Sequence, residues 1–417
     1  MTMNSTLPIF DCDGHVTEPA DLWTSRLPSK WAGDIPHTRI IPRSEASLTL
    51  IGEGPISDPR LDNLEMWFTG DKMLSTAAAG ARAGWGGAFP SFPPTLEHAS
   101  DAARDARARL EYMDSAGIAV QALYPNVGGF GSQTWRAMPD QELALACVRA
   151  YNDFLIDWCS PAPDRFVPVA AIPFWDLTAA VEEIERAASI GHRGLIFSGA
   201  PQNHDQPLLG DPHWDPMWTA AQAHDMVVSF HLGSGNFGSR HHLADRLKRE
   251  GLAQTFTRIT VAGFLDGAQH VLDLLLSGVL DRYPDLRFFA AESGIGWLPF
   301  VLESMDYYSM RSGQDFDREM RPSDYFRRQV YASFWYEQIA PERLLDYIGE
   351  DNVVFETDFP HPSCLYPEHE VKEAMARVLE PLNEPTRRKI AYENACRMFG
   401  RDPKSVTNLI DRRSSAG

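Results

Sequence analysis

Residues 10–19 read Phe10-Asp11-Cys12-Asp13-Gly14-His15-Val16-Thr17-Glu18-Pro19, and this stretch decides how the rest of the sequence is interpreted. It overlaps the end of a predicted strand over residues 7–13 and places a carboxylate and an imidazole two positions apart. Residues i and i+2 of a strand point to the same face, so Asp13 and His15 should project together. Oxygen and nitrogen donors on one face are what a divalent metal ion needs from two of its ligands. Asp-x-His is common by chance, so its significance depends on similar residues at the ends of later strands.

Apolar, strand-like runs alternate with amphipathic, helix-like segments along the chain. This alternation is typical of parallel strands joined by helical crossovers. We count seven predicted strands and a shorter one over residues 330–333, so the sequence favours a distorted (β/α)8 TIM barrel over an open, doubly wound sheet. No GxGxxG motif follows the first strand, which argues against a dinucleotide-binding sheet. The predicted strands cover residues 7–13, 118–124, 166–172, 194–197, 226–230, 286–291, 330–333 and 353–356.

A single domain over residues 1–411 is predicted, with a long insertion after strand 1. Residues 23–98 are too many for an ordinary connection, and they are rich in tryptophan and phenylalanine. We expect this insertion to fold over the barrel mouth as a lid or to reach a neighbouring subunit of a homodimer. An ordinary extension of the core is the alternative. The polar residues 412–417 are predicted to form a frayed tail.

Composition narrows the function classes. The net charge of −19 would repel nucleic acid and anionic membrane surfaces, so we expect neither as a partner and predict a small-molecule substrate. The sequence contains no run of about eighteen apolar residues, so we predict no membrane span. The first residues do not resemble a signal peptide. The five cysteines are scattered, without CxxC spacing, which favours a reducing cytoplasm over a disulfide framework.

Three further strands end in residues that can bind a metal or move a proton. His231 follows residues 226–230, Glu292 follows 286–291, and Asp358 follows the run that ends at Thr357. Taken singly, each has an ordinary alternative: a core histidine, a loop carboxylate facing solvent, or an aspartate that initiates a turn. Together with Asp13 and His15 they stand at the carboxyl ends of four strands, where the active sites of barrels lie.

Neighbouring residues are weaker candidates. His361 follows Asp358 by three positions and is a candidate substrate contact or partner of that aspartate. Tyr124 and Asn126 follow the second predicted strand and could line the pocket as substrate-binding residues, although a turn role for Asn126 is equally natural. Glu356 shares a strand face with Asp358 and is an alternative partner for the ligands.

These motifs resemble the amidohydrolase superfamily, and within it the branch called amidohydrolase family 2, which is related to aminocarboxymuconate-semialdehyde decarboxylase. The resemblance rests on residues 11–19, on His231 and on Glu356-Thr357-Asp358-Phe359-Pro360-His361, and residues 388–400 are similar to the final helix of that branch. It implies a (β/α)8 barrel with one divalent metal ion. Asp13 and His15 would stand where the family has a His-x-His pair, His231 would be the strand-5 ligand, and Asp358 the strand-8 ligand that orients or deprotonates water.

The resemblance leaves the reaction open, because Glu292 stands where the family often has a histidine that contacts substrate. An ionised Glu292 would repel a substrate carboxylate, whereas the residue could equally be protonated, act as a general base or bind the metal as a fifth ligand. Of the possible reactions we expect hydrolysis, in which a metal-bound water is activated against a carbonyl substrate. Asp358, Glu292 and His361 are its catalytic candidates. Non-oxidative decarboxylation of a small aromatic or enoic acid is the alternative, and an inactive barrel that serves as a binding protein is the second. We expect Zn²⁺, with Mn²⁺ as the alternative because Asp13 makes the ligand set richer in oxygen.

Overall fold

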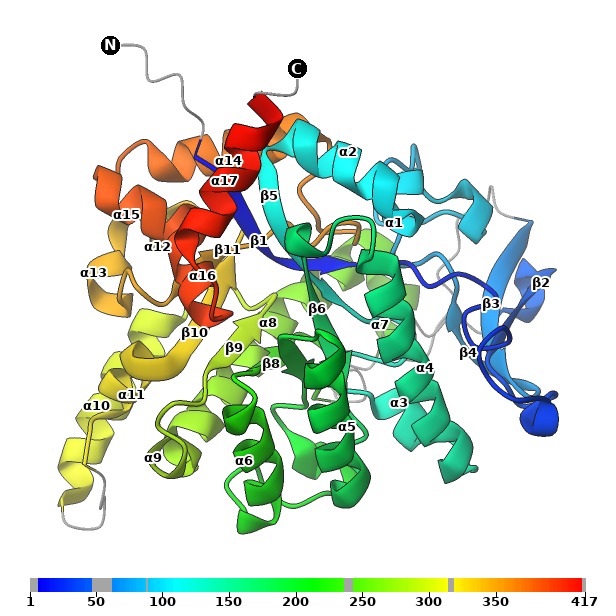
Figure 1. The fold of residues 1–417 in the computed structure, drawn as a ribbon, viewed down its shortest axis with the longest axis horizontal. Helices are drawn as coiled ribbons and strands as arrows, with labels where there is room; N and C mark the ends of the chain where they lie inside the picture. Colours follow the sequence, from blue (N-terminus) through cyan, green and yellow to red (C-terminus); the bar gives the residue numbers. More distant parts are fainter. Residues whose placement is uncertain (1–6, 47–61, 88, 236–242, 314–318, 415–417) are drawn as a thin grey trace.

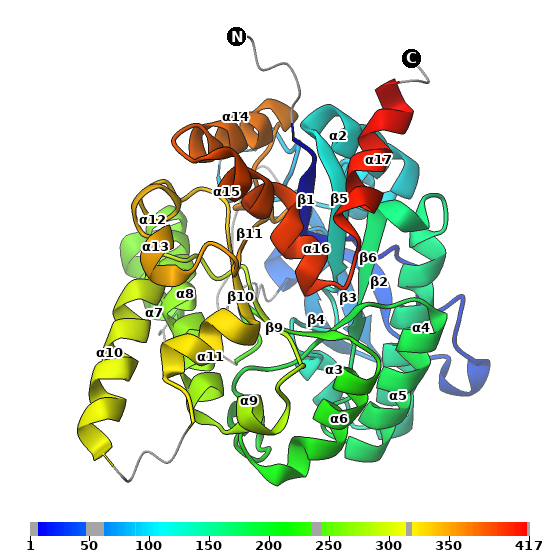
Figure 2. The same cartoon turned by 60° about the vertical axis from the view of Figure 1, so that its left-hand side comes forward.

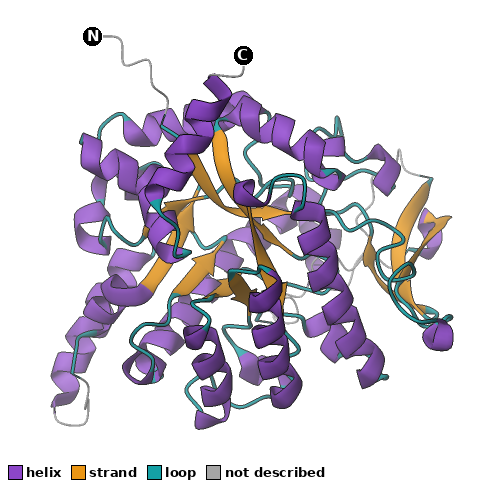
Figure 3. Cartoon of the chain, in the orientation of Figure 1, coloured by secondary structure: helices purple, strands orange, loops and turns teal. Residues whose placement is uncertain are grey.

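Eight parallel strands form the centre of the molecule, with helices around them (Figures 1 and 3). The computed structural model describes residues 7–46, 62–87, 89–235, 243–313 and 319–414. The strand order follows the chain, which confirms the predicted barrel, and the predicted strand boundaries differ from the observed ones by at most two residues. The strands are β1 (Ile9–His15), β5 (Ile118–Tyr124), β6 (Phe166–Ala171), β7 (Gly194–Ile196), β8 (Val227–His231), β9 (Phe288–Ala291), β10 (Val330–Phe334) and β11 (Val353–Phe355).

The barrel closes where the first strand meets the segment that follows the last one. The His15 N–H donates to the Phe359 carbonyl at 2.7 Å, and the Asp358 N–H donates to the Asp13 carbonyl at 3.0 Å. Beside this seam, β1 carries a bulge. Asp11 pairs with Gln121 and Gly14 pairs with Leu123, so β1 has one more residue than β5 between these two pairs. The bulge and the seam together fix the direction of the side chains at the end of β1.

Helices cover the outside of the barrel and follow the strands in order. α2 (Ala106–Ala116) shows how the sequence sets their ends: the Asp105 carboxylate accepts hydrogen bonds from the first turn, and Gly117 ends the helix with φ of 81°. The C-terminal helices α16 and α17 lie beside β1 and β5 (Figure 2). The other main helices are α4 (Gln141–Cys159), α5 (Leu177–Ile190), α6 (Asp215–Ala223), α8 (Leu252–Leu276), α10 (Leu298–Ser312), α11 (Pro322–Gln329), α14 (Glu368–Leu379), α16 (Asn394–Met398) and α17 (Pro403–Ser414).

Helix α8 is the longest of the described helices, and residues Ala253–Leu276 are long and apolar enough to cross a membrane by length and composition. In the fold, half of the most apolar 18-residue window of that stretch is buried, and α8 packs against β8, α10 and α11. Its inner side chains therefore belong to the layer of helices around the barrel.

The insertion after β1 contains a separate three-stranded antiparallel sheet at one side of the barrel (Figure 1). Its strands are β2 (His37–Pro42), β3 (Asn63–Thr69) and β4 (Lys72–Thr76). Trp67 of β3 meets Trp23 edge to face at 5.1 Å, and Trp23 meets Trp135 of the barrel at the same centroid distance. This aromatic cluster attaches the insertion to the barrel. Its role as a lid or a subunit contact stays a prediction.

The tail is shorter than the sequence predicts. Residues 412–414, expected to be frayed, belong to the last turn of α17, because the helix that begins at Pro403 continues to Ser414. Residues 415–417 lie outside the described part of the chain.

Candidate metal centre

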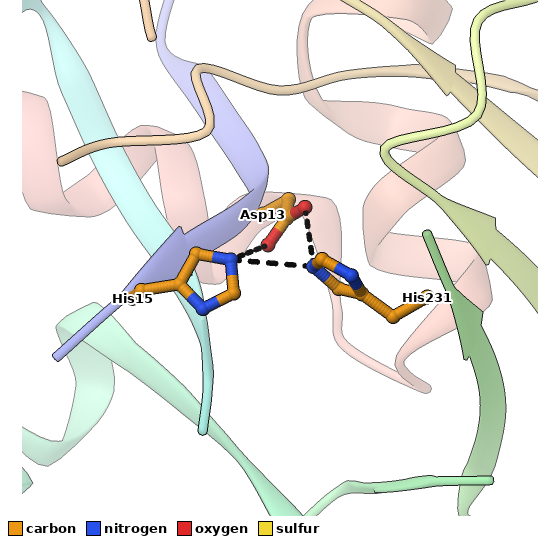
Figure 4. A group of neighbouring side chains, drawn as sticks. All are labelled: Asp13, His15 and His231. Atoms are coloured by element: carbon orange, nitrogen blue, oxygen red, sulfur yellow. Dashed lines mark hydrogen bonds and ion pairs between the residues drawn. The ribbon is translucent and has the colours of Figure 1, made fainter. Parts of the chain in front are cut away.

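The four predicted metal ligands meet at the carboxyl end of the barrel. Asp13 and His15 come from the end of β1, His231 from the end of β8, and Asp358 from the segment after β11, and all four are fully buried. One Asp13 oxygen lies 3.3 Å from His15 Nε2 and the other lies 3.2 Å from His231 Nε2 (Figure 4). The two histidine Nε2 atoms are themselves 3.2 Å apart.

These distances fit a shared cation. A metal ion about 2.1 Å from each ligand atom separates neighbouring ligands by about 3.0 Å in an octahedron and about 3.4 Å in a tetrahedron. Both Asp13 oxygens are buried and, within the described residues, receive no hydrogen bond. Buried carboxylate oxygens are costly unless a hydrogen-bond donor or a cation satisfies them. Asp13, His15 and His231 therefore form a donor set that suits one divalent metal ion, and Asp358, 3.7 Å from His15 Nε2, is the fourth candidate.

Asp358 connects the ligands to His361. His15 Nε2 is 3.7 Å from Asp358 Oδ1, and His361 Nδ1 is 2.7 Å from the same oxygen. On its other side, His361 Nε2 is 2.7 Å from Asn126 Oδ1, while the Asn126 amide group donates to the Val16 carbonyl. The asparagine thus offers its oxygen to His361 and orients the imidazole toward Asp358.

The charges around the ligands favour metal binding. Burial opposes ionisation of Asp13, but His231 and His15 outweigh it, and the pKa of Asp13 is lowered. Burial and the neighbouring His361 lower the pKa of His15 to about 4, so its imidazole is neutral at pH 7. Burial also opposes a charge on His231, but Asp13 raises the pKa of His231 overall. A metal ion would replace the proton that Asp13 otherwise attracts to this cluster.

Glu292 stands at the edge of the ligand cluster. Its Oε2 atom is 3.8 Å from His231 Nδ1, and its backbone N–H donates to a carboxylate oxygen of Glu356 at 3.2 Å. Burial and the nearby Asp358 and Asp13 carboxylates raise the pKa of Glu292 well above its ordinary range. Glu292 and Asp358 also adopt left-handed backbone conformations, with φ of 50° and 56°. Residues other than glycine adopt this strained conformation mainly where a site requires it.

A buried network that the sequence analysis did not identify supports the ligands from below. Asp11 accepts hydrogen bonds from the Thr357 N–H at 2.8 Å, the Thr357 hydroxyl at 2.6 Å and the Gln121 amide at 2.7 Å. Gln121 in turn accepts from Arg109 at 2.7 Å, and Arg109 also donates to the His15 carbonyl at 2.6 Å. The network joins β1, β5 and the segment that carries Asp358. Asp11 lies inside the motif of residues 10–19, but no sequence pattern marks Arg109.

A cavity of about 300 Å³ opens above the ligands. Glu292, His361 and Asn126 line it, as the sequence predicts for catalytic and substrate-binding residues. Tyr124 does not: it is fully buried, and its hydroxyl hydrogen-bonds the Ser229 hydroxyl at 2.9 Å, so its prediction as a substrate contact is not supported. The side chain of the last residue of a strand can point into the barrel or toward the cavity at its end, and the Tyr124 side chain points into the barrel.

Phe130 is one of the cavity-wall residues that the sequence analysis missed. Its ring stacks on the His231 imidazole, with centroids 4.4 Å apart and an interplanar angle of 19°, and it meets His15 edge to face at 5.5 Å. Gly233 leaves the space for this ring, because a Cβ atom there would lie 3.2 Å from Phe130. The glycines around Phe130 are the signal that could have marked this loop.

The family model for amidohydrolases, Amidohydro_2, matches residues 10–401 of the chain. The chain belongs to this family. The match includes every ligand candidate and the cavity residues, and it confirms the resemblance found in the sequence.

The chain is similar to two decarboxylases and to one further amidohydrolase. Gamma-resorcylate decarboxylase from Rhizobium sp. (strain MTP-10005) is 28% identical over 308 residues, which cover 70% of this chain and 86% of that protein. An amidohydrolase from Mycobacterium avium subsp. paratuberculosis K-10 has the same fold, with a TM-score of 0.71, 21% identity and coverage of 95% and 100%. The structure of 5-carboxyvanillate decarboxylase from Novosphingobium aromaticivorans DSM 12444, in complex with manganese, has a TM-score of 0.57, 23% identity and coverage of 72% and 82%.

Proposed function

We propose that this amidohydrolase is a metal-dependent, non-oxidative decarboxylase of a small aromatic or enoic acid. The observation that carries the proposal is the buried cluster of Asp13, His15, His231 and Asp358 beneath a small cavity, in a chain whose relatives include decarboxylases. Decarboxylation is the alternative that the sequence left open, and these relatives favour it over the hydrolysis that we expected.

The charge argument for hydrolysis assumes that Glu292 is ionised. Burial and Asp358 raise the pKa of Glu292 well above its usual range, which favours the protonated form. A protonated acid does not repel a substrate carboxylate, and it has a proton to give. The raised pKa therefore weakens the charge argument for hydrolysis.

The residues have distinct roles in this proposal. When bound, a divalent cation supplies Lewis-acid stabilisation for the substrate carboxylate. Glu292 gives its proton to the carbon that bears this carboxylate, the bond between the two carbons then breaks, and carbon dioxide leaves. His361, held between Asp358 and Asn126, also lines the cavity and contacts the substrate there.

Manganese is the cation that we propose. Two of the four ligands, Asp13 and Asp358, are carboxylates, and hard oxygen ligands suit Mn²⁺ better than a site rich in nitrogen or sulfur does. The manganese in the related 5-carboxyvanillate decarboxylase supports the same choice. Zn²⁺ is the competing cation, and metal analysis of the purified protein decides between them.

The test is a panel of substrates offered to the Mn²⁺-loaded enzyme. Aromatic and enoic acids are assayed for carbon dioxide, and lactones, amides and esters for hydrolysis. We expect carbon dioxide from at least one acid, and a loss of about 100-fold in kcat for Glu292→Gln, which keeps its metal. Glu303→Gln, an exposed glutamate on α10, is the control and should keep full activity.

Two outcomes would contradict the proposal. Hydrolysis of an ester or amide without carbon dioxide from any acid would restore the hydrolase. No turnover of any compound by fully loaded protein would favour the inactive barrel that acts as a binding protein.

A further inference from the structure

Two polar side chains of the cavity, His361 and Glu292, stand at its floor, the end of the cavity next to the ligand cluster. His361 contacts Asp358 at 2.7 Å, and Glu292 lies 3.8 Å from His231. Both side chains also line the cavity. A substrate whose carboxylate points toward the floor would therefore leave the rest of its body in the upper part.

Large apolar side chains form part of the cavity wall: Val127, Phe130, Leu232, and Phe256 and Ile259 of α8. The Phe130 ring, parallel to His231, offers a flat face beside the ligands, and planar groups stack well on such a face. The walls thus suit a flat, apolar body, and about 300 Å³ is at the small end of the volumes found for ligand sites.

Lysine and arginine are absent from the described residues that line the cavity. The ionisable side chains among these residues are Glu18, Glu292 and His361. Arg82, close in sequence to the wall residue Gly80, uses its guanidinium group on the backbone carbonyls of Ser91 and Gly87. A second anionic group on the substrate would therefore lie among apolar side chains without a lysine or arginine of the described lining to pair with.

We infer that the substrate is a monocarboxylate with a small, flat, apolar body, and that the cavity excludes acids that carry a second anionic group. This inference rests on the proposed function, because the reacting carboxylate is assigned to the metal site. In this inference, α8 contributes to the selectivity, because Phe256, Ile259 and Thr260 of this helix line the cavity without offering a cation.

The test measures binding to the Mn²⁺-loaded full chain by isothermal titration calorimetry. The probes are two pairs that differ by one carboxylate: benzoate with isophthalate, and 2-hydroxybenzoate with 2-hydroxyisophthalate. We expect each monocarboxylate to bind at least about tenfold more tightly than its dicarboxylate partner. Equal or tighter binding of the dicarboxylates, or binding of neither probe of a pair, would overturn the inference.

A matched pair of variants on α8 tests the wall itself. Thr260 lines the cavity, whereas Thr257, one turn earlier, is exposed to solvent, and each threonine hydroxyl donates to a carbonyl of its own helix. Thr260→Lys supplies the missing cation and should reduce the selectivity ratio to about threefold or less, while Thr257→Lys should leave it unchanged. A folded Thr260→Lys protein with the wild-type ratio would also overturn the inference.

The outcomes separate this inference from the proposed function. Selective binding of monocarboxylates without carbon dioxide release from any acid would contradict only the decarboxylase. Release of carbon dioxide from dicarboxylates with a kcat/KM equal to that for monocarboxylates would contradict only the selectivity.

Discussion

Replacing Arg109 by methionine tests whether the buried network controls the metal centre. Arg109 lies on α2, is fully buried, and donates hydrogen bonds to three acceptors from three parts of the chain. These acceptors are the Ala102 carbonyl at 2.6 Å, the Gln121 side chain at 2.7 Å and the His15 carbonyl at 2.6 Å. Its guanidinium group also lies over the Phe359 ring at 4.5 Å. Methionine keeps much of the apolar stem and removes every donor.

The magnitude follows from these contacts. A hydrogen bond to a charged group contributes about 1.5 kcal/mol at the low end of its range, so the three together contribute about 4.5 kcal/mol. Removing a buried charge recovers part of this, and we expect the free energy of unfolding to fall by about 3 kcal/mol. Because one acceptor is the carbonyl of the ligand His15, the Kd for Mn²⁺ should rise about tenfold.

Two measurements check this prediction. Urea unfolding of the metal-free protein, followed by circular dichroism, gives the free energy of unfolding, and calorimetric titration gives the Kd for Mn²⁺. Arg107→Met is the control, because Arg107 is exposed on the same helix and its change should stay within about 0.5 kcal/mol. The reasoning is refuted if Arg109→Met leaves the Mn²⁺ affinity unchanged, and its energy estimate is refuted if the stability falls by less than about 1 kcal/mol.

Three further predictions follow. Burial lowers the pKa of His192 from 6.5 to about 4, so the unfolded chain binds the extra proton, and stability should fall as the pH drops from 6.5 to 4. In His192→Gln, the urea midpoint of unfolding should change less with pH over this range than it does in the wild type. A pH dependence equal to that of the wild type would contradict the assignment to His192. Asn126→Leu removes the acceptor that orients His361 and should lower kcat about tenfold at full metal occupancy, whereas unchanged kcat makes that orientation irrelevant. Leu265 is 57% exposed on the outer face of α8. If this face forms the predicted homodimer, Leu265→Glu should convert the dimer to a monomer in sedimentation experiments. A wild type that is already monomeric would contradict this prediction.

The fold could be predicted from the sequence because its strands are short apolar runs that end in polar residues. The predicted strand over residues 118–124 coincides with β5, and the bounds of the others shift by one or two residues. The meeting of the ligand candidates could be predicted for the same reason, since each of them stands where a strand ends and parallel strands end on one side of the barrel. Asp13, His15 and His231 form one group there, and Asp358 lies 3.7 Å from His15, while their role as metal ligands stays a prediction.

What could not be predicted depends on neighbours that are distant in sequence. The pKa of Glu292 is raised by burial and by carboxylates on other strands, and sequence spacing contains no information on either. Tyr124 ends its strand as the ligand candidates do, but its hydroxyl hydrogen-bonds Ser229 inside the barrel. The position of a residue at the end of a strand does not predict which way its side chain points. Arg109 lies on a helix surface pattern that is typical of a solvated arginine, and only the packing of α2 against β1 and β5 buries it.

The residues that supply the ligand side chains also supply the backbone groups that close the barrel. His15 and Asp358 belong to opposite ends of the sequence, and their backbone groups form the two hydrogen bonds of the seam. Asp11 adds a bond to Thr357 across the same seam. A metal ion that joins these side chains must therefore hold the first strand to the segment after the last one, so that metal affinity and barrel closure rise or fall together. The left-handed backbone of Asp358 is sustained by this arrangement: its N–H is fixed by the Asp13 carbonyl, and its carboxylate by Ser363 and His361.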